Sequence, residues 1–154
     1  MGLILVIAKT GKEKRVAVDL EDALFHLDSN VKAWFTGFPG VLLVELRGDS
    51  VRAGEVLERF HVKDVLKIRP FLKVLKAREV AFLCDAIGGL ISGDSVGVRV
   101  YVRGRVLDKE YVEKLVFSCL EKLRVKPVFA SDNFLTVDVI EDIIGISLVN
   151  KKNA

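Results

Sequence analysis

Valine alternates with glycine, tyrosine or arginine along residues 96–103, in the sequence VGVRVYVR. Successive side chains of a β-strand point to opposite faces of its sheet, so this period of two predicts a strand with one buried valine face. The other face carries Gly97, Arg99, Tyr101 and Arg103. Because guanidinium groups bind phosphate and an aromatic ring stacks on a base, this face is a candidate nucleic-acid surface. The same alternation also occurs in a solvated antiparallel strand, so the pattern alone fits an ordinary sheet surface as well.

The hydrophobic pattern before Pro70 predicts strands at residues 3–8, 31–36, 41–46 and 65–69. Between them it predicts one helix that begins at Asp19 and reaches residue 27, and a second helix capped by Ser50. Gly54 is unfavourable inside the second helix by about 1 kcal/mol relative to alanine, which indicates close packing on a neighbour. The resulting order, β-α-β-β-α-β, is that of a ferredoxin-like module.

After Pro70 the pattern predicts a helix at residues 77–91, the strand at 96–103, and a helix from an N-cap at Asp108 to about residue 123. A closing hairpin is expected from residues 134–140 and 143–149, with its turn at Glu141 and Asp142. The fold class is therefore α/β (α+β). We expect a ferredoxin-like module at residues 1–73 and a smaller α/β domain at residues 74–154.

Basic residues gather in two stretches of the sequence. The first runs from Lys67 to Arg78 without an acidic residue, and the second follows the valine strand. The candidate RNA-binding residues are Lys67, Arg69, Lys73, Lys76, Arg78, Arg99, Tyr101, Arg103, Arg105 and Lys109. A solvated linker is the alternative for the first stretch. Residues 9–15 form another basic segment, but it lacks the glycine and lysine spacing of a phosphate-binding loop and is interpreted as a solvated turn.

The overall charge is too small to attract nucleic acid by itself. The 154 residues are 51% hydrophobic and 29% charged, with a formal net charge of +3. RNA contact would therefore depend on local clustering of cations. The hydrophobic run at residues 3–8 is shorter than a membrane span and has no basic segment before it. These features predict a cytoplasmic protein with no membrane association.

The two cysteines, Cys84 and Cys119, form no CxxC pair and have no neighbouring histidine, so the sequence supports no zinc site. Both lie among hydrophobic residues. This setting favours buried free thiols in a reducing compartment, with a disulfide or a nucleophile as the alternatives.

No combination of residues indicates a catalytic site, a metal or a cofactor. Neither His26 nor His61 lies beside a nucleophile or carboxylate at a motif spacing, and no dinucleotide-binding glycine motif is present. Asp138, Glu141 and Asp142 fit the polar positions of a solvated hairpin better than a metal site. The protein is therefore predicted not to be an enzyme.

The sequence resembles the THUMP domain together with its N-terminal module, as found in RNA-modifying proteins. Residues 97–105, the helix that follows Asp108, and the strands at 135–140 and 145–148 carry the resemblance to the domain. Residues 38–45 are similar to the hairpin of the N-terminal module. The resemblance implies RNA binding, most often at the acceptor end of tRNA, through a groove between the two modules. It implies that catalysis belongs to an additional domain.

The resemblance further implies an adaptor that helps a separate cytidine acetyltransferase to make N4-acetylcytidine in tRNA. The expected partners are thus tRNA and a tRNA-modifying enzyme, with no DNA. The alternative function is a protein-interaction module that does not bind RNA directly, with Trp34, Phe35 and Phe117 as candidate contacts. A small enzyme is the least favoured interpretation.

Overall fold

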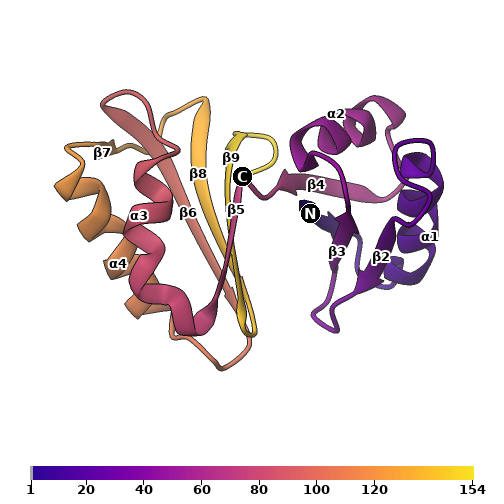
Figure 1. Cartoon of the computed structure of the whole chain (residues 1–154), viewed down its shortest axis with the longest axis horizontal. Helices are drawn as coiled ribbons and strands as arrows, with labels where there is room; N and C mark the ends of the chain where they lie inside the picture. Colours follow the sequence, from indigo (N-terminus) through magenta and orange to yellow (C-terminus); the bar gives the residue numbers. More distant parts are fainter. Residues whose placement is uncertain (1) are drawn as a thin grey trace. The chain divides into compact units, whose positions relative to one another are not determined.

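A computed structural model describes residues 2–154, and it divides into two compact units. The first unit reaches Phe71 and also contains Asn153, and the second runs from Leu72 to Lys152 and also contains Ala154. Each unit has its own β-sheet and helices (Figure 1). The predicted α+β class is confirmed. No helix within residues 2–154 is long and apolar enough to cross a lipid bilayer.

The first unit has the predicted β-α-β-β-α-β order. Its elements are β1 (Gly2–Ala8), α1 (Glu13–Leu24), β2 (Lys32–Phe35), β3 (Val41–Leu46), α2 (Ser50–Phe60) and β4 (Val65–Pro70). The strands lie in the order β2-β3-β1-β4, and every neighbouring pair is antiparallel. This arrangement is the ferredoxin-like sheet that the hydrophobic pattern predicted.

Both helices of the first unit pack on one face of its sheet. Val16, Leu20 and Leu24 of α1 are buried in one hydrophobic core with Val56 and Leu57 of α2. The sheet contributes alternate residues of β1 and β3 to the same core, as expected for a period of two.

The close packing expected at Gly54 is confirmed. A Cβ atom at this position would overlap the ring of Pro70 at the end of β4. A larger residue would therefore force α2 away from β4.

Two helix starts differ from the prediction. Helix α1 begins at Glu13, and Asp19 lies inside it and pairs with Arg15 at 2.9 Å. The buried Val16 extends the hydrophobic stripe one turn before Leu20, so the helix starts earlier than the polar residue at position 19 suggested.

The second helix is capped by Asp49, whose carboxylate accepts the N–H of Val51 at 2.9 Å. Ser50 is instead the first helical residue. Its buried hydroxyl donates to the carbonyl of Phe71 at 2.9 Å. Adjacent aspartate and serine are both good N-caps, so the sequence alone does not decide between them.

Glu13 explains why the basic segment at residues 9–15 adopts a fixed turn. Its buried carboxylate accepts the backbone N–H groups of Gly11 and Gly40, each at 2.8 Å. The bond from Gly40 is the largest cause that holds the pKa of Glu13 below its ordinary value, and burial opposes it. The carboxylate therefore fastens two turns to the start of α1.

Acidification should therefore weaken the protein through Glu13. A lowered pKa in the folded state means that the stabilisation is complete above the ordinary pKa of 4.5 and is lost as the pH falls through the folded value. We expect Glu13→Gln to flatten the fall of the melting temperature between neutral and acidic pH. Thermal unfolding monitored from pH 7 to pH 3 measures it, and an unchanged acid profile would contradict this role.

The second unit contains a mixed sheet covered by helices on one face. Its elements are β5 (Lys73–Lys76), the 3-10 helix η1 (Ala77–Phe82), α3 (Leu83–Gly88), β6 (Ser95–Arg103), α4 (Lys109–Lys122), β7 (Lys126–Pro127), β8 (Asn133–Ile140) and β9 (Ile143–Asn150). The strand order is β5-β9-β8-β6-β7. Strand β6 runs parallel to β8, and β8 pairs with β9 as the predicted hairpin.

The predicted valine face of β6 packs against the helices. Val96 and Val100 are buried in one core with Leu83 of α3 and with Val112 and Val116 of α4. Asp108 caps α4 as predicted, because its carboxylate accepts the N–H of Tyr111 at 3.2 Å. The strand therefore separates a hydrophobic face from the face that carries the arginines.

The region between the first unit and β6 differs from the prediction. Residues 73–76 form an edge strand paired with β9, so the solvated linker that was the alternative for this stretch is not what these residues form. The single helix expected at residues 77–91 is divided into η1 and the short helix α3. Four residues are too few to show a strand period, and β5 forms by pairing with β9, which is distant in the sequence, so the sequence alone did not predict it.

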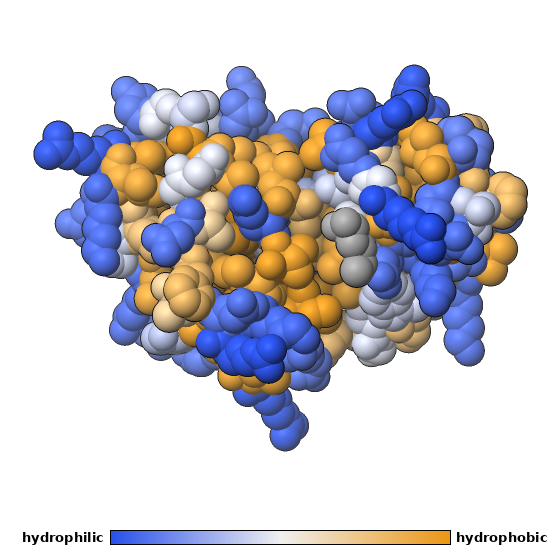
Figure 2. Space-filling view, viewed as in Figure 1, coloured by the Kyte–Doolittle hydropathy of each residue, from blue (hydrophilic) through white to orange (hydrophobic). Residues whose placement is uncertain are grey.

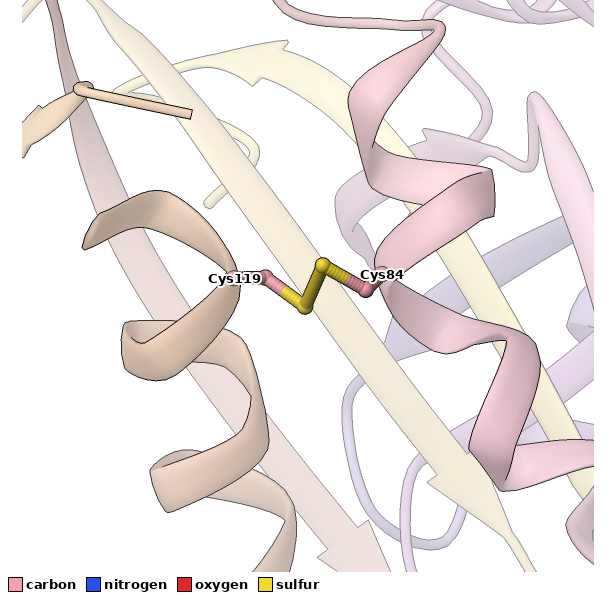
Figure 3. The surroundings of a disulfide bond; sticks show 2 residues. All are labelled: Cys84 and Cys119. Atoms are coloured by element: carbon pink, nitrogen blue, oxygen red, sulfur yellow. A yellow bond between two sulfur atoms is a disulfide. The ribbon is translucent and has the colours of Figure 1, made fainter. Parts of the chain in front are cut away.

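Cys84 and Cys119 form a disulfide, so the free thiols favoured by the sequence are wrong. Cys84 lies on α3 and Cys119 on α4, with their Cα atoms 5.2 Å apart (Figure 3). The two helices bring together cysteines separated by 35 residues in the sequence. Neither composition nor spacing reveals such a pairing.

Candidate nucleic-acid interface

Arg99, Tyr101 and Arg103 lie along the face of β6 that is opposite the helices. The guanidinium of Arg103 lies 5.5 Å from the centre of the Tyr101 ring, and that of Arg99 lies 4.8 Å from the ring of Phe134 on β8. These cation–π contacts hold both guanidiniums near the sheet. Arg99 is exposed, while Tyr101 and Arg103 are partly buried.

The strand register brings the carboxyl ends of the two predicted basic stretches to one edge of the sheet. Arg103 pairs with Ile140, Ile140 with Ile143, and Ile143 with Lys76. Strands β5, β6 and β8 are parallel, so their carboxyl ends meet at this edge. With strands about 4.8 Å apart, Lys76 and Arg103 are separated by roughly 14 Å.

We name this surface the carboxyl-end edge. Its cations end β5 and β6, lie two residues beyond these strands, or begin α4: they are Lys76, Arg78, Arg103, Arg105 and Lys109. All except Arg103 are exposed. Gly104 turns the chain here with a φ of 98°, which a residue with a side chain adopts only with strain. The edge is therefore able to offer several cations to a polyanion.

Carboxylates lie among these cations, so the edge is not uniformly positive. The side chain of Glu141 lies against Gly104, and its N–H donates to the carbonyl of Arg103 at 2.9 Å. Glu79 accepts the N–H of Lys76 at 2.9 Å and caps η1. Affinity for RNA would thus depend on the placement of single cations, as the small net charge also requires.

Asp138 was expected to be a solvated hairpin residue, and the structure places it in the interior. It is 0% exposed, and its carboxylate accepts a bond from Arg103 at 3.4 Å. Parallel pairing of β6 with β8 sets Asp138 opposite Tyr101, which brings it within reach of Arg103. The alternating pattern of its strand was the sequence feature that could have indicated the burial of Asp138. The sequence does not reveal, however, which strand lies beside this one.

The remaining predicted residues lie elsewhere. Arg69 is 1% exposed, and its guanidinium donates to the carbonyl of Asn153 at 3.0 Å, so it serves the fold and leaves the proposed RNA-binding set. Lys67 is partly buried on β4 in the first unit. Lys73 is exposed on β5, where lysines also protect a sheet edge from pairing with other chains.

Comparison with known proteins gives matches among solved structures. No protein-family model matches the sequence, and no curated protein matches it. The fold is shared with TrmN from Thermus thermophilus, at a TM-score of 0.67 and 16% identity over 95% of this chain and 45% of TrmN. It is also shared with a 4-thiouridine synthetase solved with RNA and bound ATP, at a TM-score of 0.60 and 12% identity over 97% of this chain and 42% of the synthetase.

A third structure of this fold is described as a predicted N6-adenine-specific DNA methylase from Listeria monocytogenes, with a TM-score of 0.58 and 13% identity. It is matched over 96% of this chain and 40% of its own. This chain thus spans less than half the length of each of the three proteins. At such identities the likeness shows the fold, which is THUMP-like, as the sequence resemblance implied.

The prediction that the protein is not an enzyme is wrong. Chains with this fold include a synthetase and a protein described as a methylase, and their matched portion corresponds to nearly all of this chain. The lack of a catalytic motif in the sequence therefore does not set the protein apart from enzymes.

Proposed function

We propose that this protein binds tRNA and holds it for a tRNA-modifying reaction. The observation that carries the proposal is the convergence of two separate basic stretches on the carboxyl-end edge, with Arg99 and Tyr101 leading to it along β6. Guanidinium and ammonium groups contact phosphates, and an exposed single strand offers bases that stack on aromatic rings. The shared fold with a synthetase solved with RNA supports the same partner.

Binding to tRNA should depend strongly on salt. With about five phosphate contacts, affinity is expected to fall by about 10²–10³-fold between 50 and 200 mM salt, because each contact releases a counterion. A filter-binding titration of bulk tRNA at several salt concentrations measures the slope, with duplex DNA as competitor. If the protein does not retain tRNA even at 50 mM salt, or if DNA displaces it equally well, the proposal fails.

The finer proposal is that a separate cytidine acetyltransferase acts on the bound tRNA, with the acceptor end as the contacted region. It is supported by the resemblance of the sequence to THUMP-domain adaptors. Cells that lack this protein are then expected to lose N4-acetylcytidine from tRNA, as measured by nucleoside mass spectrometry. An unchanged N4-acetylcytidine level would exclude this enzyme and leave tRNA binding intact.

Exposed hydrophobic side chains are candidate contacts for a protein partner. Trp34 and Phe35 on β2 are each 38% exposed, and Phe117 on α4 is 43% exposed. Figure 2 shows hydrophobic residues at the surface of both units among the hydrophilic ones. These residues favour contacts with a modifying enzyme in addition to RNA binding.

A further inference from the structure

The disulfide between Cys84 and Cys119 involves the segment that follows the carboxyl-end edge in the sequence. Strand β5 ends at Lys76, the 3-10 helix η1 carries Arg78, and α3 carries Cys84 directly afterwards. The bond joins this segment covalently to α4, which is part of the core (Figure 3). One of the five cations of the edge, Arg78, therefore belongs to the segment that the disulfide holds, whereas Lys76 ends β5 and is held by the pairing with β9.

Apart from the disulfide, the segment is held by Leu83 and Ile87 in the core and by the N–H of Ala77, which donates to the carbonyl of Asp142 at 2.6 Å. Among residues 77–88 only Ala77, Leu83 and Ile87 are buried, and Phe82 is 58% exposed. A 3-10 helix has poor hydrogen-bond geometry, and a six-residue α-helix is not stable without tertiary contacts. The segment ends at Gly88 and Gly89, which add backbone freedom.

Cys119, at the other end of the disulfide, lies on α4, which is held much more firmly than α3. Helix α4 has 14 residues, an aspartate N-cap, and Val112, Val116 and Leu120 at 0% exposure. If the disulfide opens, α4 keeps its place and the η1–α3 segment gains freedom. Cys84 is partly exposed and Cys119 is 5% exposed, so Cys84 is the cysteine at which a small thiol is expected to attack.

We propose that the Cys84–Cys119 bond is a redox-sensitive device that fixes Arg78 for RNA binding. This inference rests on the proposed tRNA-binding function. In the oxidised protein the segment is ordered and presents Arg78. Reduced, it must be ordered at the moment of binding, which lowers affinity.

The reducing partner is a dithiol. Its thiolate attacks the sulfur of Cys84, the bond between the two protein sulfurs breaks, and Cys119 leaves as a thiolate that takes up a proton. The second thiol of the reductant then displaces Cys84 and closes a ring disulfide. Two electrons and two protons pass from the dithiol to the cysteines.

Hydrogen exchange tests the device without RNA. The oxidised protein, the dithiothreitol-reduced protein and the variant Cys84→Ala with Cys119→Ala are compared, with thiol alkylation and mass spectrometry to confirm the redox state. We expect amides of residues 77–88 to exchange about tenfold faster in the reduced protein and in the variant, while those of α4 stay unchanged. Unchanged exchange at 77–88, or equal acceleration throughout the unit, would overturn a local device.

The affinity of each form for tRNA is the second readout. Reduction should weaken binding by about three- to tenfold, and dithiothreitol should have no effect on the double-alanine variant. Equal affinity of the oxidised and reduced forms would overturn the link to RNA. If neither form binds tRNA, the proposed function fails together with this link, while the exchange result decides independently whether the segment responds to reduction.

Discussion

Replacing Arg78 and Arg105 together with glutamine is expected to weaken tRNA binding by about tenfold or more. Both side chains are exposed at the carboxyl-end edge, one after β5 and the other after β6. Each lost phosphate contact also lowers the salt dependence, so the slope of log affinity against log salt should become shallower by about 2. Filter binding at several salt concentrations measures both quantities.

The matched control is Arg52→Gln with Arg59→Gln. These residues are exposed on α2 of the first unit, outside the carboxyl-end edge. The control removes the same charge from the protein, so a comparable loss of affinity would mean that overall charge matters and the position does not. Melting curves of all variants should match that of the unchanged protein.

Arg103→Leu is expected to lower the free energy of unfolding by about 3 kcal/mol, which corresponds to a fall in melting temperature of roughly 6–12 °C. Asp138 is completely buried, so removal of the guanidinium leaves a carboxylate that cannot reach water. The side chain of Arg103 is 22% exposed, so the reverse change is milder: in Asp138→Asn the guanidinium can turn towards solvent. Urea unfolding of both variants measures the difference.

The asymmetry between the two substitutions is the critical result. If Asp138→Asn costs as much stability as Arg103→Leu, the buried carboxylate is not the reason for the cost. Arg99→Leu serves as a control, since Arg99 is exposed and its contact is with the Phe134 ring. It should change stability by less than about 1 kcal/mol.

Sequence periodicity predicted most elements because each one has a face that is buried within its own unit. The valines of β6 and the stripe of α4 point to a single core, and local spacing is enough to identify them. The order of elements in the first unit was predicted correctly for the same reason, as was the close packing of Gly54, whose neighbour in the structure is Pro70. Helix starts were less predictable, because adjacent polar residues compete to cap them.

Features that depend on distant partners were not predictable. Arg69 has the charge of a surface residue, but its partner is 84 residues away in the sequence. The cysteine pairing and the burial of Asp138 depend in the same way on which helix or strand lies next to which. The candidate site also depends on distant partners. Its two basic stretches were recognised in the sequence, but the pairing of β6 with β8, β8 with β9 and β9 with β5 places their ends at one edge.

Asn153 determines when, during protein synthesis, the first unit can complete its hydrogen bonds. Its side chain accepts the N–H of Ile68 at 3.1 Å and donates to Glu58 at 2.7 Å, and its carbonyl accepts from Arg69. Domains generally fold in order as they leave the ribosome. The first unit, although made first, acquires these bonds only after residue 153 has been added, so residues 72–152 of the second unit have been translated before the first unit is finished.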